Sequence, residues 1–167
     1  MGHFQETRPG EIVVTTSPRM LQDLFEKLKP GLEPATRDRF DTSRVYLLLD
    51  ELLSNIHRHG YAGEDRRPIG VRLRLHHEYV YLAVRDLAPT FDSARHAETR
   101  TAPPPDSGQT GGMGLVIVRS MCESLTHQVP HEGGNALYLV MKLMRRPGLA
   151  PARTRERQTA GGGSFGE

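Results

Sequence analysis

Hydrophobic residues recur at three- and four-residue steps in three stretches of the chain, a spacing that predicts amphipathic helices. The middle stretch is the most regular, with apolar positions at Val45, Leu48, Leu49, Leu52, Leu53 and Ile56. Asp41-Thr42-Ser43 offers candidate caps before it, and Gly60 ends it. Ser17-Pro18 and Pro30-Gly31 bound an earlier helix, so the predicted helices lie near residues 18–29, 42–59 and 113–125.

Runs of β-branched and alternating residues predict four strands. The first strand is the β-branched run Glu11–Thr16, and the last is Asn135–Leu143. Between them, the neighbouring strands Ile69–His76 and Tyr79–Arg85 are predicted to form a hairpin. With the helices, these strands predict an α/β two-layer sandwich. A mixed, mostly antiparallel sheet is covered by the helices on one face, and residues 1–145 form one domain.

Three stretches lack such a pattern. Leu32–Phe40 is polar, and we expect it to be irregular. Ala88–Gly111 is rich in Pro, Ser, Thr and Gly, and a loop of this length in a compact domain is usually a functional lid or disordered. Residues 146–167 have almost nothing to bury and are predicted to form a disordered tail.

Charge is unevenly spread over the 167 residues. The net charge is +2, but five Arg and two Glu from Arg145 onward contribute +3, which leaves −1 for the rest. A nearly neutral body gives no electrostatic case for direct nucleic-acid binding. Cys122 is alone, which excludes a disulfide framework. Without a long apolar run or a signal-peptide pattern, the sequence predicts a cytoplasmic protein with no membrane contact.

A polar stripe runs beside the apolar stripe of the middle helix. Glu51, Asn55 and His59 are each four residues apart, so in an α-helix they stack on nearly one face. The amide oxygen of Asn55 suits a hard cation such as Mg²⁺, which keeps waters and borrows phosphate oxygens. Glu51 could polarise a hydroxyl aimed at a phosphate. For each residue in isolation, a solvated Glu and a helix-packing Asn are the favoured explanations.

Two further features carry chemistry. Asp86 ends an apolar strand, where its carboxylate could accept from the exocyclic amine of a base; a turn Asp bonded to its own backbone is the plainer alternative. Gly111-Gly112-Met113-Gly114 opens a predicted helix with free backbone N–H groups that suit a phosphate, although short glycine runs are more often plain turns. The order of all three features favours a nucleotide site.

These motifs resemble the boxes of the GHKL (Bergerat-fold) ATP-binding domains. Glu51-x-x-x-Asn55-x-x-x-His59-Gly60-Tyr61 looks like their N-box, and the segment from Val84 to Asp92 looks like their first glycine box. Gly112-x-Gly114-Leu115 looks like the second. The His-Gly-Tyr ending, with Pro89 and Phe91-Asp92 after the strand, is most similar to anti-sigma factor serine kinases of the RsbW/SpoIIAB type.

The resemblance, which covers roughly Glu11–Leu143, implies a role for each motif. Asn55 would hold Mg²⁺, Glu51 would act as the general base on a partner's Ser or Thr hydroxyl, and Asp86 would accept from the adenine amine. The residues expected at the nucleotide are Asn55, His59, Asp86, Ala88, Gly112, Met113, Gly114 and Leu115.

The implied protein is an ATP- and Mg²⁺-dependent serine/threonine kinase that acts as an anti-sigma regulatory factor. Its substrate would be an anti-anti-sigma (STAS) protein, its second partner a sigma factor, and it would form a homodimer. Ala88 stands where the family usually has glycine, and its methyl group could crowd adenine.

The departure at Ala88 leaves a second interpretation open, a degenerate Bergerat-fold module that binds a partner without kinase activity. A histidine-kinase catalytic domain is disfavoured because no phosphoacceptor helix pair precedes the first strand. ATPases of the gyrase or MutL kind are longer and lack the His-Gly-Tyr ending.

Overall fold

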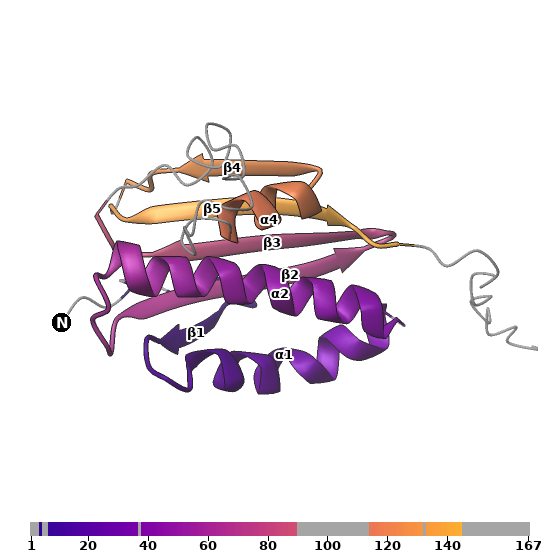
Figure 1. Ribbon diagram of the computed structural model, residues 1–167, viewed down its shortest axis with the longest axis horizontal. Coiled ribbons are helices and arrows are strands. Elements are labelled where there is room, and N and C mark those ends of the chain that lie inside the picture. Colours follow the sequence, from indigo (N-terminus) through magenta and orange to yellow (C-terminus); the bar gives the residue numbers. More distant parts are fainter. Residues whose placement is uncertain (1–3, 5–6, 37, 90–113, 132, 145–167) are drawn as a thin grey trace, which may run out of the picture.

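The computed structural model describes residues 4, 7–36, 38–89, 114–131 and 133–144. Figure 1 shows the described elements as two layers, a sheet and a set of helices. The predicted tail at 146–167 and nearly all of the predicted lid at 88–111 lie outside the described residues.

The sheet has five described strands in the order β1-β2-β3-β5-β4, and every pairing between them is antiparallel. The strands are β1 (Ile12–Thr15), β2 (Pro68–His76), β3 (Tyr79–Asp86), β4 (Ser124–Gln128) and β5 (Asn135–Lys142). The four predicted strands are present. The edge strand β4 was not predicted, because its short and mostly polar sequence extends a helical pattern that ends earlier, at Met121.

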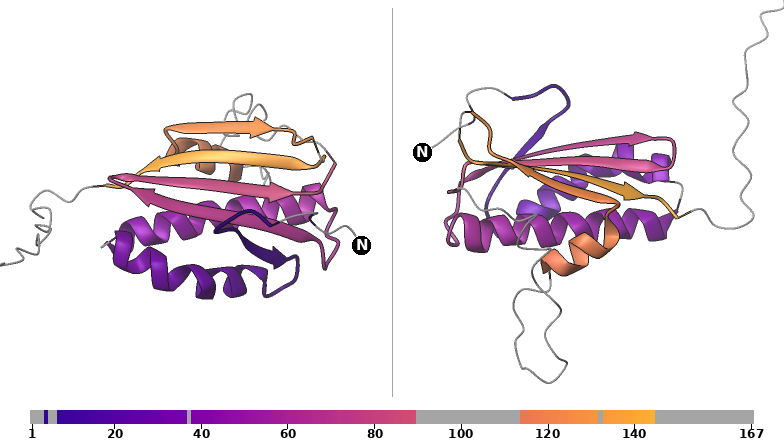
Figure 2. Two further views of the ribbon diagram at one scale, coloured as in Figure 1. Left: turned by 180° about the vertical axis from the view of Figure 1, so that it is seen from behind. Right: turned by 90° about the horizontal axis from the view of Figure 1, so that it is seen from above.

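Three helices cover one face of this sheet, as the view from above in Figure 2 shows. They are α1 (Met20–Thr36), α2 (Arg39–Asn55) and α4 (Gly114–Met121), and α2 continues directly into a π-helical turn, η1 (Ile56–Gly60). The predicted two-layer sandwich is therefore confirmed. The opposite face of the sheet carries no described helix.

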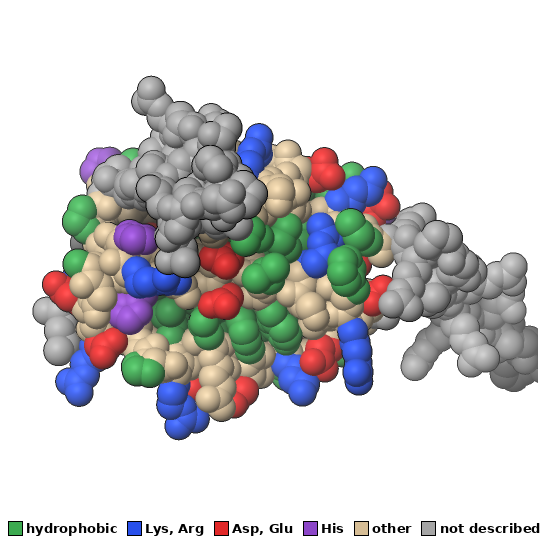
Figure 3. All heavy atoms as spheres, viewed as in Figure 1, with side chains coloured by type: hydrophobic (Ala, Val, Ile, Leu, Met, Phe, Trp, Pro, Cys, Tyr) green, Lys and Arg blue, Asp and Glu red, His purple; other side chains and the backbone are tan. Residues whose placement is uncertain are grey.

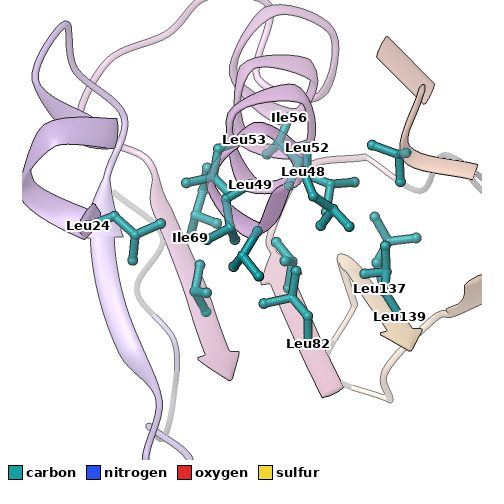
Figure 4. Packing of buried hydrophobic residues seen from close by; sticks show 14 of the residues in the cluster. Leu24, Leu48, Leu49, Leu52, Leu53, Ile56, Ile69, Leu82, Leu137 and Leu139 are labelled. Atoms are coloured by element: carbon teal, nitrogen blue, oxygen red, sulfur yellow. The ribbon is translucent and has the colours of Figure 1, made fainter. Parts of the chain in front are cut away.

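The hydrophobic core lies between α2 and the sheet. Figure 4 shows side chains of α2 pointing at strand residues that alternate along β2, β3 and β5. Leu49, Leu53 and Ile69 are completely buried. On the sheet side of the core, Leu82, Leu137 and Leu139 are buried as well. The apolar stripe of the sequence is thus the face that fixes α2 on the sheet.

Helix α1 does not end at Pro30-Gly31 as predicted. It continues through Pro30 and Pro34 to Thr36, because buried residues recur every four positions along its whole length: Met20, Leu24, Leu28, Leu32 and Thr36. Each proline removes one backbone hydrogen bond, and the buried stripe outweighs that loss. The predicted irregular stretch Leu32–Phe40 is therefore mostly helical.

Helix α2 begins earlier than predicted. Asp38 is its N-cap, since its Oδ1 accepts from the Phe40 N–H at 2.9 Å. Asp41 and Thr42, predicted as caps, lie inside the first turns and are buried. Asp41 pairs with Arg44 at 3.0 Å, so its carboxylate ties the helix start together.

Candidate functional site

Asp86 lies at the end of β3 with its side chain on the helix-covered side of the sheet. It is only 3% exposed. Its Oδ1 accepts from the Ala88 N–H at 2.8 Å and from the Asn135 amide at 2.9 Å. Burial raises the pKa of Asp86, and these hydrogen bonds and the nearby His127 partly counter that rise. Both bonds end on Oδ1, and among the described residues no hydrogen bond to Oδ2 is present.

Sequence reasoning missed two residues of this site, Asn135 and His127. Asn135 is the register partner of Asp86 at the start of β5, and its amide group is buried. His127 on β4 contacts the Asn135 Oδ1 through Nε2 at 2.9 Å. The antiparallel pairing of β3 with β5 could have placed Asn135 beside Asp86, had the register been known.

Tyr61 fixes the backbone that follows Asp86. Its hydroxyl donates to the Pro68 carbonyl at 2.7 Å and accepts from the Leu87 N–H at 2.7 Å. The ring is buried, and burial raises the pKa of Tyr61 to about 12, so the hydroxyl keeps its proton at neutral pH. The tyrosine of the His-Gly-Tyr motif therefore connects the end of η1 with the ends of β2 and β3.

Gly134 allows a close backbone approach to the same strand end. Its φ is +76°, and a Cβ at this position would overlap the Asp86 carbonyl oxygen. A larger residue would push β5 away from β3 at the site. Gly134 is another site residue that the motif analysis did not single out.

Ala88 is packed against Gly60 instead of standing free in the site. Ala88 is 3% exposed, and a Cβ on Gly60 would lie 3.0 Å from the Ala88 methyl carbon. Within the described ranges, the non-glycine residues with positive φ are Ala62, Arg66 and His77, so Ala88 keeps an ordinary backbone. The methyl group fills the space that the glycine of η1 leaves.

Glu51 and the start of α4 lie together, although they are 63 positions apart. A Cβ on Gly114 would overlap the Glu51 Oε2, so the carboxylate lies against the first residue of α4. Among described residues, neither Glu51 nor Asn55 has a hydrogen bond or ion pair to another side chain, and both are partly exposed. These groups remain available to a ligand.

The π-turn changes the predicted polar stripe. The Tyr61 N–H donates to the Ile56 carbonyl at 2.8 Å, an i to i+5 bond that widens the helix after Asn55. His59, the last residue of the predicted stripe, lies in this turn and is exposed. Figure 3 shows histidine and basic side chains at the η1 end of this face and acidic ones nearer its middle.

The remaining predicted residues divide into two groups. Gly112 and Met113 lie outside the described residues. Leu115 is buried in the core, where it anchors the first turn of α4. The Cys122 thiol packs beside this core, and burial raises its pKa to about 11, which argues against a nucleophilic role.

A second buried carboxylate lies on the opposite face of the sheet. Glu11 forms a bidentate ion pair with Arg85, at 3.1 Å from Nε and 2.8 Å from Nη2. The hydrogen bonds and charge of Arg85 and Arg8 lower the pKa of Glu11, against the effect of burial. A Cβ on Gly70 would collide with this carboxylate, and the Phe4 ring lies 4.1 Å from the Arg85 guanidinium. The sheet separates this cluster from Asp86.

Comparison with known proteins identifies the family. The model of the histidine kinase-like ATPase domain matches residues 19–143, most of the chain. The chain belongs to this family. Membership implies ATP binding, and the matched range contains Glu51, Asn55, Asp86 and Gly114. No curated protein sequence matches the chain significantly.

The chain can also be compared with solved structures of other proteins. A chain of the SiaB–SiaC complex from Pseudomonas aeruginosa aligns with TM-score 0.61 and 13% identity, over 78% of this chain and 88% of that chain. The mycobacterial sensor histidine kinase MprB gives TM-score 0.45, 18% identity and coverages of 79% and 97%. The histidine kinase domain of the E. coli osmosensor EnvZ gives TM-score 0.43 and 16% identity, over 92% of this chain and 99% of that chain. At this level of identity, the first similarity shows a shared fold.

Two kinds of feature are absent from the part of the chain that the structure describes. No described helix is long and apolar enough to cross a membrane. The same residues contain no group of three or more His, Cys, Asp or Glu side chains placed to hold a metal ion.

Proposed function

We propose that this chain is an ATP- and Mg²⁺-dependent serine/threonine protein kinase that acts as an anti-sigma regulatory factor. The observation that carries the proposal is the position of the Glu51 carboxylate against Gly114 at the start of α4. A candidate base and a candidate phosphate-binding helix start are thus neighbours. Among the described residues, Glu51 has no basic partner that would assign it a structural role.

The base of ATP fits the Asp86 end of the site. The adenine amine is a donor, and Oδ2 of Asp86 is a free acceptor in a buried setting where a satisfied hydrogen bond matters most. The Ala88 methyl packs on Gly60, which supports a place for the base beside the carboxylate.

The phosphates fit the other end, at the N-terminus of α4. Free backbone N–H groups and the positive end of the helix dipole favour anions there. Asn55, one turn after Glu51 on α2, would hold Mg²⁺ through its amide oxygen, and the bound cation would neutralise charge on the phosphates.

Glu51 would take the proton of the attacking hydroxyl. In a loose phosphoryl transfer most of the rate comes from positioning and charge stabilisation, and a positioned base adds about 10²–10⁴-fold. Glu51 is partly exposed, so a hydroxyl from a second protein can reach it. A partly exposed base suits a hydroxyl group of a second protein better than a hydroxyl group of this chain.

The proposed substrate is an anti-anti-sigma (STAS) protein, and the proposed second partner is a sigma factor. The sequence motifs support this class, and the SiaB–SiaC structure was itself solved as a complex of two proteins. The proposal extends to a homodimer that works in the cytoplasm.

Two substitutions test the proposed roles. In Glu51→Gln, ATP binding should persist in isothermal titration, while transfer of labelled γ-phosphate to a STAS protein from the same cell should fall by about 10²–10⁴-fold. In Asn55→Ala, nucleotide binding should lose its Mg²⁺ dependence. Asp50→Asn is the matched control, because it removes the same charge from the neighbouring position of α2.

Unchanged transfer by Glu51→Gln would overturn the base assignment, and unchanged Mg²⁺ dependence in Asn55→Ala would overturn the metal role. A wild-type chain that binds ATP but transfers no phosphate to any STAS protein would favour the module without kinase activity.

A further inference from the structure

Three polar side chains form a continuous hydrogen-bonded chain from the edge of the sheet to the candidate base-binding carboxylate. His127 on β4 contacts the Asn135 Oδ1 at 2.9 Å, and the Asn135 Nδ2 donates to the Asp86 Oδ1 at 2.9 Å. Asn135 and Asp86 are both buried, whereas His127 is partly exposed. Burying apolar side chains at these positions would cost less free energy, so the three polar side chains are expected to have a specific role.

The surroundings of Asn135 fix which way its amide points. Three acceptors surround the Nδ2 end: the Asp86 carboxylate at 2.9 Å, and the Ala88 and Pro89 carbonyls, each at 3.4 Å. A carbonyl oxygen turned toward these groups would face only other acceptors. The Asn135 Oδ1 must therefore face His127, and the Nε2 of His127 must carry a proton to donate to it.

This orientation decides how Asp86 meets a ligand. The Asn135 and Ala88 N–H groups both bind Oδ1, and together they hold the carboxylate plane and leave Oδ2 open. We propose that His127 and Asn135 are positioning residues for nucleotide binding: His127 orients the Asn135 amide, which in turn holds Asp86 with Oδ2 directed at the base. This inference rests on the proposed nucleotide site.

The same arrangement favours the ionised form of Asp86, which is the stronger acceptor. Burial raises the pKa of Asp86, and the Asn135 bond, the Ala88 bond and His127 act in the opposite direction. Among the described residues, Tyr61 also faces Asp86, and it stays neutral at neutral pH because burial raises its pKa to about 12. Arg85, the next residue on β3, is paired with Glu11 on the other face of the sheet.

Loss of the Asn135 donor should therefore raise the pKa of Asp86 further. The carboxylate is a stronger acceptor for the adenine amine than the neutral carboxyl group, so binding would weaken at a higher pH as the solution is acidified. If Asn135 only stabilised the fold, its loss would lower the free energy of unfolding but would not move the pH at which binding weakens.

The test measures ADP binding by isothermal titration from pH 4.5 to 8, with the Asp86 carboxyl pKa read by NMR in the ligand-free protein. Asn135→Leu should weaken ADP binding by about 10-fold at neutral pH. It should also raise the Asp86 pKa and the pH at which binding weakens on acidification. His127→Leu should do the same to a smaller extent. His127→Gln, whose amide can still donate to Asn135, should restore wild-type behaviour.

Gln128→Leu serves as the control, because it is an exposed residue of the same strand. Variants of Asn135 and His127 that keep the wild-type affinity and pH profile would overturn the positioning roles alone. His127→Gln behaving like His127→Leu would overturn the role of the imidazole donor. A wild-type chain with no ADP binding at millimolar concentration would overturn the nucleotide site itself, and the positioning roles with it.

Discussion

Two buried carboxylates lie on opposite faces of this sheet, and they are satisfied in opposite ways. Glu11 is bound on both oxygens by the Arg85 guanidinium, and its pKa is lowered. Asp86, which directly follows Arg85 in the chain, receives only neutral donors on one oxygen, and its pKa is raised. The first pair is closed, whereas the second leaves a partner position open.

The difference separates a structural role from a binding role. A closed ion pair gains its stability within the protein, and nothing is left for a ligand. A buried carboxylate with one free oxygen is costly to the folded state until a donor fills that position. Strained or costly groups of this kind are expected where a protein binds its substrate.

The largest effect should come from breaking the closed pair. Arg85→Met leaves the buried Glu11 charge without its guanidinium partner, so the free energy of unfolding should fall by about 3–5 kcal/mol, measured by urea denaturation. The double variant Glu11→Leu/Arg85→Met should recover much of this loss, because it removes the stranded charge. If the single variant were as stable as wild type, Glu11 and Arg85 would not be a structural pair.

Removing the open carboxylate should affect binding without cost to the fold. Asp86→Asn keeps an acceptor for the Ala88 and Asn135 N–H groups but places an NH₂ group where the adenine amine would donate. We expect ATP binding to weaken by about 100-fold in isothermal titration, with an unchanged or higher melting temperature. A loss of stability with full affinity would reverse the roles assigned to the two carboxylates.

A smaller effect is expected at the residue that holds Asp86 from the backbone. Ala88→Gly keeps the N–H that donates to Asp86 but removes a methyl group packed on Gly60. Stability should fall by about 1–2 kcal/mol, and ATP affinity should stay unchanged. Tighter binding in this variant would mean that the methyl group crowds the base, which is the concern that the sequence raised.

The smallest expected effects are changes in the free energy of unfolding with pH. The contributions of Glu11 and Asp86 should have opposite signs. The pKa of Glu11 is lowered from 4.5, so its stabilisation is complete above that pH and is lost as the pH falls through its folded-state pKa. The pKa of Asp86 is raised from 3.8, so its ionisation costs stability as the pH rises from 3.8 through its folded-state pKa.

Urea denaturation between pH 3 and 7 measures both slopes, with Glu11→Gln and Asp86→Asn as references. The advantage of wild type over Glu11→Gln should grow with pH, and its stability relative to Asp86→Asn should fall. Two slopes of the same sign would contradict the comparison.

The fold was largely predictable because the buried stripes are visible in the sequence. The exceptions arise where burial competes with a local signal. Pro30 and Pro34 are strong local stops, but Leu32 and Thr36 continue the buried stripe of α1 beyond them. In the same way, Asp38 caps α2 although Asp41-Thr42-Ser43 offers a more conspicuous group of caps.

The site was predictable only in its local motifs. Glu51 and Asp86 could be proposed from the sequence, since each stands at a recognisable place on an element. Asn135, His127 and Tyr61 could not, because their roles depend on strand register and on contacts between distant segments. A sequence pattern fixes which face of a strand is buried, but the residue opposite it is set by the pairing.

The π-turn at Ile56–Gly60 is equivalent to an α-helical turn with one additional residue. Deleting one residue there would leave a regular α-helical turn, because the residue that follows could still donate to the Ile56 carbonyl, now at i to i+4. Tyr61 would then keep its place at Leu87. An inserted residue has no such turn to relax into, so one added codon in this segment should be more damaging than one deleted codon.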